Sequence, residues 1–279
     1  MRIGLAQIDS VPGEIDQNLN NMRIYVKQAH EQEVDLLVFP ELYVSGYSLG
    51  QISEEVSLAP SDPRLKPLLE DTGAMSITFG LHEDGGLRTY NSAVYFEAGR
   101  LAHVHRKLYL PTYGAFEERK HFSPGQSMCA FNTKHGAMAM MVCNDAWQSV
   151  LPFLAVQDGA QILLIPTNSA DSRFSGRVDN VDYWHGITQF YARMFQSVVV
   201  FVNRVGCEGE FQFWGRSHIA GPSGEIIAEA PCGEPALIVA DIDLQEVRRQ
   251  RRRVPLIKEA RLSLLCREFD RLAQNGGDL

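Results

Sequence analysis

The sequence predicts a mixed α/β fold in which helices cover mixed β-sheets. Two observations support this prediction: strand-like apolar runs alternate with segments of helical periodicity, and several consecutive strand-like runs are joined by tight turns. The alternation is typical of βα units, whereas hairpins require antiparallel neighbours. A purely parallel, doubly wound sheet has no place for the hairpins, so mixed sheets are expected.

The individual elements follow from the same patterns. Strand-like segments cover residues 2–8, 35–39, 75–82, 89–97, 101–108, 137–142, 162–166, 197–203, 218–221, 226–230 and 237–242. Apolar residues recur with helical spacing over 16–33, 176–195 and 258–272. The turns at 83–86, 98–100 and 221–224 are rich in glycine and predict hairpins between the strands that flank them.

Composition limits the class of protein. Of the 279 residues, 45% are hydrophobic and 22% are charged, which is ordinary for a folded protein with a sizeable core. Layered α/β enzymes of this length are commonly one domain, and no linker or repeat is visible, so we expect a single domain over 1–279. The net charge of −8 argues against nucleic-acid binding, because phosphate recognition requires a broad basic surface. The arginine-rich run 248–253 is interpreted as a solvated or interface-facing helix end.

The compartment is predicted from targeting signals and cysteines. Residues 1–9 lack a signal-peptide pattern, and no run approaches the ~18–20 apolar residues of a membrane span. The cysteines are odd in number, widely spaced and without a CxxC pair, as expected for reduced thiols: Cys129, Cys143, Cys207, Cys232 and Cys266. We therefore expect a cytoplasmic protein that binds no membrane and no zinc. The glycines form no GxGxxG or P-loop pattern, so no nucleotide cofactor is expected.

Three predicted strands lead into a chemically reactive side chain. The run 35–40 leads into Glu41, the run 101–105 into Arg106 and Lys107, and the run 137–142 into Cys143. A buried strand that stops at a polar turn is a typical place for a nucleophile. A cysteine thiol has an ordinary pKa of about 8.5, so it requires a base or a nearby cation to react near neutral pH. Glu41 is a candidate base, and Lys107 a candidate for stabilising the thiolate and an oxyanion.

These three segments resemble the signature of the nitrilase superfamily of carbon-nitrogen hydrolases. The matching stretches are 39–47, 105–114, 116–125, 142–147, 202–206 and 221–225. The resemblance extends from Met1 to about Arg261, and the three catalytic motifs occur in order with family-like spacing. It implies a four-layer α-β-β-α sandwich with two mixed sheets.

The resemblance implies a role for each matching residue. Glu41 is the expected general base, Lys107 the oxyanion stabiliser and Cys143 the nucleophile. Glu118 corresponds to the family's second glutamate and is favoured over its neighbour Glu117. No metal or organic cofactor is required by this set.

Further residues are predicted to bind substrate. The backbone N–H of Asn144 would complete the oxyanion hole, since the residue after a nucleophile elbow is placed to donate there. Tyr47, Tyr113 and Trp147 lie beside the catalytic residues in the sequence and are interpreted as lining the substrate site. Aromatic residues near strand ends also commonly belong to the core, so this second interpretation stays open for them.

The implied reaction is hydrolysis of a non-peptide carbon-nitrogen bond in a small linear amide. A cysteine thioester would form with release of ammonia or an amine, and water would then release a carboxylic acid. The motif Cys-x-Asp-x-Trp is most similar to the motifs of the amidase and glutaminase-like branches, whereas true nitrilases usually carry Cys-Trp-Glu. Hydrolysis of an N-carbamoyl amide, or of a nitrile, on the same residues is the alternative. A complete glutamine-dependent NAD synthetase is not expected, because 279 residues are too few to include its ATP-pyrophosphatase domain, whereas a free-standing relative of its glutaminase half stays open.

Three alternative hypotheses assign the function to different residues or assume no catalysis at all. A papain-like hydrolase would pair Cys143 with His185 or His218 as the base. A metal hydrolase would be built on the pair His103 and His105, although no downstream partner has metal-site spacing. A catalytically silent binding or scaffold protein would be favoured if the Glu-Lys-Cys set were incomplete.

The resemblance also implies assembly of identical subunits. A homodimer or a higher homo-oligomer is expected. Its substrate is expected to be a small-molecule amide rather than a macromolecule. The segment 184–195 and the C-terminal helix and tail, 256–279, are the candidate interface.

Overall fold

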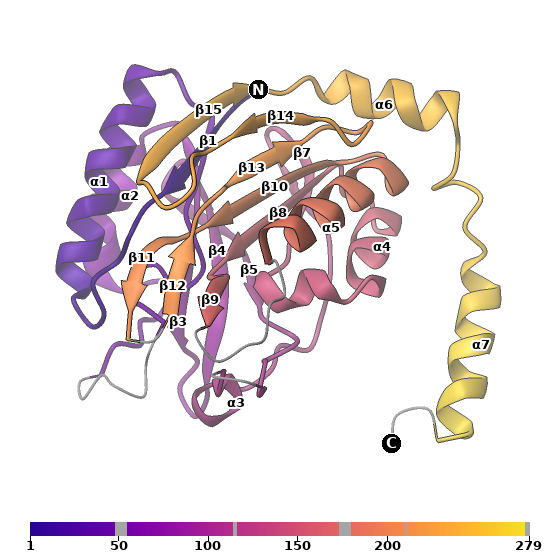
Figure 1. Ribbon diagram of the computed structural model, residues 1–279, viewed down its shortest axis with the longest axis horizontal. Helices are drawn as coiled ribbons and strands as arrows, with labels where there is room; N and C mark the ends of the chain where they lie inside the picture. The colour runs from indigo at the N-terminus through magenta and orange to yellow at the C-terminus, as the bar shows by residue number, and fades with distance from the viewer. Residues whose placement is uncertain (48–54, 114–115, 173–179, 210, 277–279) are drawn as a thin grey trace.

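The computed structural model describes residues 1–47, 55–113, 116–172, 180–209 and 211–276, and Figure 1 gives its course from the N-terminus to the C-terminus. Its centre consists of two six-stranded sheets. The first sheet has the order β15-β1-β2-β3-β4-β5, with β1 (Arg2–Gln7), β2 (Leu36–Val38), β3 (Ser76–Asp84), β4 (Thr89–Glu97), β5 (Arg100–Arg106) and β15 (Ala236–Asp241). Its strands β1, β2 and β3 are parallel, and the remaining pairs are antiparallel.

The second sheet repeats this mixture of parallel and antiparallel pairs. Its order is β14-β13-β10-β8-β7-β6, with β6 (Phe131–Thr133), β7 (Gly136–Met140), β8 (Ile162–Thr167), β10 (Val198–Asn203), β13 (His218–Ala220) and β14 (Ile226–Glu229). Strands β7, β8 and β10 are parallel at its centre. A small third sheet joins β9 (Ala170–Ser172), β11 (Val205–Glu208) and β12 (Phe211–Trp214).

Helices cover the outer faces of both large sheets (Figure 1). On one side are α1 (Ile15–Glu31) and α2 (Lys66–Thr72), and on the other α4 (Val150–Gln157) and α5 (Asn180–Met194). The shorter α3 (Glu118–His121) follows β5, and α6 (Leu244–Arg253) and α7 (Leu262–Gln274) end the described chain. Of the helices in the described residues, none is long and apolar enough to cross a membrane.

Three hydrophobic clusters correspond to the three contacts between four layers. The first joins α1 residues such as Met22 to Phe79 of the first sheet. The second lies between the sheets, where Leu5 and Val38 belong to the same cluster as Leu164. The third joins the second sheet to α4 and α5 through residues that include Leu151, Ala155, Leu163, Tyr191 and Val199. The predicted four-layer sandwich with two mixed sheets is therefore confirmed.

Some element boundaries differ from the prediction. The first helix begins at Ile15 and ends at Glu31, and the last begins at Leu262 and ends at Gln274. Of the helical pattern over 176–195, the part 176–179 lies outside the described residues. Helix α4 was not predicted, because its sequence VLPFLAVQ is apolar on all sides and has no amphipathic period.

Candidate active site

The sheets deliver three reactive side chains just beyond strand ends. Glu41 follows β2, Lys107 comes directly after β5, and Cys143 follows β7 at the start of a 3-10 segment, η3 (Cys143–Trp147). β2 and β5 belong to the first sheet and β7 to the second. The site therefore combines residues from both sheets.

Lys107 lies between two buried carboxylates. Its Nζ donates to Glu41 Oε1 at 2.7 Å and to Glu118 Oε1 at 2.7 Å. The three residues are 1%, 0% and 4% exposed, respectively. Charges are almost never buried to this extent without a partner, because their desolvation costs several kcal/mol per ion. The ammonium compensates both carboxylates at once, and Glu118, which starts the short α3, is brought into the same cluster as Glu41.

Two asparagines also hold Glu41. Asn91 Nδ2 donates to Glu41 Oε1 at 2.7 Å, and the backbone N–H of Asn168 donates to Glu41 Oε2 at 2.8 Å. Asn168 Nδ2 also donates to the backbone oxygen of Glu41 at 2.8 Å. Both asparagines are almost fully buried, at 0% and 1% exposure. The Glu41 carboxylate therefore receives hydrogen bonds on both oxygens from groups fixed in strands or at strand ends.

Neither asparagine was predicted as a site residue. Asn91 lies in β4 beside Ser92, and Asn168 follows β8 between Thr167 and Ser169, so neither stands out from its polar neighbours in the sequence. A buried asparagine requires hydrogen-bond partners, but the burial of these two follows from the fold and is not visible in the sequence.

The backbone at Glu41 is packed against β3 without room for a side chain. An added Cβ at Gly80 would lie 2.0 Å from the backbone nitrogen of Leu42 and 2.4 Å from the carbonyl carbon of Glu41. Leu42 itself has φ of 45°, in the left-handed region that L-residues seldom adopt. Glycine at position 80 is therefore necessary for the close approach that places Glu41.

Cys143 also has a left-handed backbone, with φ of 47°. Such a conformation in a residue with a side chain costs about 1–3 kcal/mol and persists only where the surroundings impose it. A sharp strand-to-helix turn of this kind exposes a nucleophile at the end of a sheet. Cys143 packs against both the cluster between the sheets and the cluster under α4 and α5.

The electrostatics of the site determine which groups carry protons. Burial raises the pKa of the Cys143 thiol well above its ordinary value, and the charge of Glu41 adds to this effect, while Lys107 opposes it. Burial acts to lower the pKa of Lys107, but the carboxylates of Glu118 and Glu41 outweigh it and raise that pKa well above its ordinary value. Burial raises the pKa of Glu118 to about 7, against the opposing effect of Lys107. At neutral pH the cluster thus contains a cationic lysine, a protonated thiol and a Glu118 carboxyl whose raised pKa favours its protonated form more than in water.

Tyr47, Tyr113 and Asn144 lie at this site. Tyr47 donates its hydroxyl to Glu118 Oε1 at 2.6 Å. Tyr113 donates its hydroxyl to Asn144 Oδ1 at 3.0 Å, and Asn144 Nδ2 donates to the backbone oxygen of Tyr109 at 3.0 Å. Tyr113 is 59% exposed, so its ring is available at the surface of the site.

Trp147 lies differently from the other predicted substrate-binding residues. Its ring stacks on Tyr183 of α5, with centroids 4.2 Å apart, and meets Trp184 edge-on. These contacts place Trp147 against α5 rather than against the carboxylates. Its role in substrate binding stays a prediction.

The residues of the competing readings lie elsewhere. Glu117 pairs with Lys120 Nζ at the surface. Burial lowers the pKa of His218 to about 4; its Nε2 lies 2.7 Å from Thr188 Oγ1, while His185 contacts Glu229. Of the two histidines in β5, His103 stacks on Phe131, and His105 contacts Asp145.

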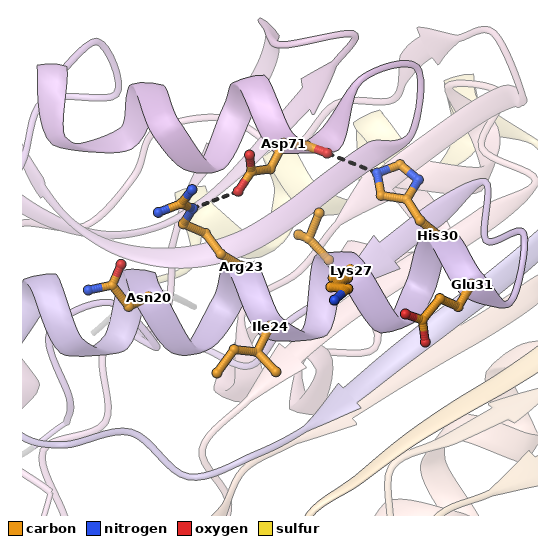
Figure 2. Close-up of a pocket in the computed structure, with 8 residues that line it drawn as sticks. Asn20, Arg23, Ile24, Lys27, His30, Glu31 and Asp71 are labelled. Atoms are coloured by element: carbon orange, nitrogen blue, oxygen red, sulfur yellow. Dashed lines mark hydrogen bonds and ion pairs between the residues drawn. The ribbon is translucent and has the colours of Figure 1, made fainter.

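A separate groove of about 600 Å³ lies on the outer surface between α1 and α2. Figure 2 shows Arg23 and His30 of α1 facing Asp71, which accepts from Arg23 Nε at 2.6 Å. The strand-end cluster is formed by Glu41, Lys107, Glu118 and Cys143. The residues that line the groove include none of these four. The groove is therefore distinct from the candidate active site.

The four-layer sandwich, with a cysteine at a sharp turn beside a lysine and two glutamates, is the architecture of the nitrilase superfamily. A model of the carbon-nitrogen hydrolase family matches residues 2–252. The chain therefore belongs to the carbon-nitrogen hydrolase family.

Individual relatives have low sequence identity but match most of this chain. The glutamine-dependent NAD(+) synthetase of Thermotoga maritima is 29% identical over 249 residues, which are 88% of this chain and 42% of the synthetase. The chain thus spans less than half of that relative. The N-carbamoylputrescine amidase of Arabidopsis thaliana is 27% identical over 269 residues, 90% of this chain and 89% of the amidase.

The fold comparison gives an amidase as well. A mutant of the amidase from Nesterenkonia sp. AN1 superposes with a TM-score of 0.81 at 25% identity, over 96% of either chain. That structure contains the acetamide moiety of fluoroacetamide added covalently at the active-site cysteine of the amidase.

Proposed function

We propose that this protein hydrolyses the carbon-nitrogen bond of a small linear amide through a thioester on Cys143. One observation carries the proposal: Lys107 Nζ bridges the buried carboxylates of Glu41 and Glu118, at 2.7 Å each, beside a cysteine at a left-handed turn. Base, cation, acid and nucleophile are the complete set that covalent hydrolysis of an amide requires. Family membership and the covalent adduct of the Nesterenkonia amidase support it.

The first step is formation of the nucleophile. The raised pKa of Cys143 means that the sulfur rests as a thiol, so its proton must leave as the amide carbon is attacked. Glu41 takes this proton; its hydrogen bonds from Asn91, Lys107 and the Asn168 backbone hold it in place before the transfer. The thiolate then forms a carbon–sulfur bond, and the carbonyl oxygen becomes an oxyanion.

The second step is collapse of the tetrahedral intermediate. Lys107 and the backbone N–H of Asn144 stabilise the oxyanion, a contribution of about 3–4 kcal/mol for one such donor in other enzymes. Glu118 Oε2, which has no hydrogen-bond partner among the described residues, carries the proton for the departing nitrogen. The carbon–nitrogen bond breaks, and ammonia or an amine leaves. The proton that Glu41 took from the thiol passes through the bridging Lys107 Nζ to Glu118, which restores Glu41 as a base. Glu41 then takes a proton from water, the hydroxide attacks the thioester carbon, and the carbon–sulfur bond breaks as that proton returns to the sulfur, which leaves a carboxylic acid and the thiol.

The acyl group is open between two substrate classes. The resemblance to the N-carbamoylputrescine amidase favours an N-carbamoyl compound as the second candidate. Both classes end in an unsubstituted amide and use the same steps, and a nitrile is the third substrate to test. A catalytically silent scaffold is disfavoured because it would have no use for a buried cluster of three charged side chains.

The test is an ammonia-release screen over linear amides, N-carbamoyl compounds and nitriles, with Cys143→Ala as the blank. We expect turnover of at least one amide or N-carbamoyl compound, abolished in the blank. Acid quench with a slow substrate should leave a thioester adduct on the peptide that contains Cys143. Full activity of Cys143→Ala, or turnover that never leaves an adduct, would contradict the mechanism.

A further inference from the structure

Asp145 forms a second buried charge cluster behind the nucleophile. Its side chain is 0% exposed and accepts on both oxygens. Oδ1 accepts from the backbone N–H groups of Leu108 and Tyr109, each at 2.9 Å. Oδ2 accepts from the backbone N–H of Val142 at 3.0 Å and lies 2.9 Å from His105 Nε2. Nothing in the proposed chemistry uses this carboxylate.

The partners of Asp145 come from the two segments that must meet for catalysis. Val142 immediately precedes Cys143, and the backbone N–H of Asp145 donates to the oxygen of Val142 at 3.0 Å, so the turn around Cys143 is closed in both directions. His105 lies two residues before Lys107 in the chain, and Leu108 directly follows it. One carboxylate therefore ties the turn of the nucleophile to the strand end that carries the cation.

The hydrogen bonds of Asp145 stabilise the backbone conformation of Cys143. The left-handed backbone of Cys143 is strained, so it keeps its conformation only where neighbouring bonds impose it. Four donors on a buried carboxylate compensate its desolvation and fix its orientation, because a charge-assisted hydrogen bond is roughly twice as strong as a neutral one. Asn144 adds a weaker link from the same turn to the backbone oxygen of Tyr109.

His105 completes the cluster as a donor. The residue is 3% exposed in β5, and a carboxylate can only accept, so Nε2 must carry the hydrogen directed at Asp145 Oδ2. That nitrogen is then unable to serve as a base for Cys143. A histidine that is engaged in this way orients its partner rather than transferring a proton in the reaction.

We propose that Asp145, supported by His105, is a positioning residue that fixes the Cys143 turn relative to Lys107. The role rests on the proposed function, since it places a nucleophile beside its cation. It predicts that loss of the tie lowers the rate of chemistry and the reactivity of the thiol more than it lowers substrate binding. A purely structural ion pair would change stability alone.

The main test is Asp145→Asn, which keeps the shape but cannot accept from all four donors. We expect kcat for a substrate from the ammonia screen to fall about 10²-fold, as for a displacement of about 1 Å near the reacting atoms, with KM nearly unchanged. Alkylation of Cys143 by iodoacetamide, followed by peptide mass spectrometry, should slow by about tenfold or more, because the thiol loses its alignment with base and cation. The exposed Cys207 in the same sample is the internal control, and its rate should not change.

Histidine variants provide a second measurement if Asp145→Asn fails to fold. His105→Leu removes the donor and should slow both kcat and Cys143 alkylation, whereas His105→Gln, whose amide can donate to Asp145, should restore most of the loss. His103→Leu is the matched control. His103 lies two residues before His105 in the same strand, and its imidazole stacks on Phe131. Folded Asp145→Asn or His105→Leu with wild-type alkylation and kcat would overturn the proposal. The alkylation measurement needs no amide substrate, so it tests the tie even if the screen finds no turnover and the proposed function fails.

Discussion

The strand-end cluster and the C-terminal helix α7 differ in which side chains they bury: the cluster buries charged side chains, and α7 exposes apolar ones. In the cluster, the charged Glu41, Lys107 and Glu118 are at most 4% exposed. In α7, no residue is buried, and Leu262, Phe269 and Leu272 are about half exposed, at 47%, 53% and 48%. Figure 1 shows the helix standing beside the body of the molecule rather than covering a sheet.

Both regions depart from ordinary burial, and each departure costs stability in an isolated chain. Charged residues are rarely buried, and contiguous exposed apolar side chains usually mark a contact surface. In the strand-end cluster the cost of burying charge is offset within the chain, because each charged side chain is paired with an opposite charge. Helix α7 leaves its apolar side uncovered by the described residues. The comparison thus contrasts charges that are paired inside the chain with apolar side chains that the described residues leave exposed.

The largest expected effect is loss of the shared cation. Lys107→Met leaves two buried carboxylates without a counter-charge, and breaking a buried pair in this way costs about 3–5 kcal/mol. It also removes the oxyanion stabiliser, so kcat/KM should fall by ~10³-fold or more. Denaturant unfolding and ammonia release measure the two effects. Lys120→Met, which removes the exposed pair with Glu117, is the control and should change neither.

The next largest effect should come from the glycine that admits Glu41. Gly80→Ala places a methyl group 2.0 Å from the Leu42 nitrogen, so the backbone that carries Glu41 must move. We expect destabilisation of about 1–3 kcal/mol, as for other overpacked sites, and a fall in kcat of at least ~10-fold. Gly186→Ala in α5 is the control: its added Cβ meets nothing within 4 Å among the described residues and should stabilise the helix by about 0.5–1 kcal/mol. Equal behaviour of the two variants would contradict the packing argument.

The pH dependence tests the assignment of Glu118. Burial raises its pKa to about 7, so its proton is lost as the pH rises through 7. If Glu118 protonates the leaving nitrogen, kcat/KM should decline above about pH 7, up to tenfold per pH unit, and this limb should be absent in Glu118→Gln. Glu117→Gln, at the surface, should keep the limb. A wild-type profile that is flat between pH 6 and 9 would remove Glu118 as the acid.

The same pKa has a consequence for stability. A carboxyl whose pKa is higher in the folded state than in the unfolded state binds more protons when folded. Its favourable contribution is fully present below the unfolded value and is lost as the pH rises through about 7. The free energy of unfolding should therefore decrease over that interval in the wild type, and less so in Glu118→Gln, when both are measured by denaturant unfolding.

The fold was predictable from the sequence because each large sheet is marked by apolar runs with charged or glycine-rich ends. Glu41, Lys107 and Cys143 could be predicted as candidate site residues for the same reason, since each follows a run directly. Asn168 and Gly80 could not, because their contacts with Glu41 depend on how β2, β3 and β8 align, and a single sequence carries no register. Helix α4 was missed because it is apolar on every side.

Proximity in sequence was a weaker guide than strand ends. Tyr47 contacts Glu118 and Asn144 contacts Tyr113, whereas Trp147, at the end of the 3-10 turn after Cys143, stacks on Tyr183 of α5; the role of all three in substrate binding stays a prediction. The apparent metal pair in β5 illustrates the same point. His103 and His105 are two residues apart, yet one packs on Phe131 and the other bonds Asp145, because their different neighbours determine what each imidazole does.

The smallest expected effect on catalysis is at α7, where the assembly proposal is tested. The apolar residues Leu262, Leu265, Phe269 and Leu272 recur at helical spacing, and we propose that a second copy of this chain covers them. Phe269→Glu combined with Leu272→Glu should shift the molar mass in light scattering toward the 31.2 kDa of one chain. Activity per subunit should persist because α7 contains none of the site residues. Arg267→Glu, which leaves the apolar residues intact, should keep the wild-type mass. A wild-type protein that is monomeric at micromolar concentration would contradict the proposal, and the exposed apolar side of α7 would then require a different partner.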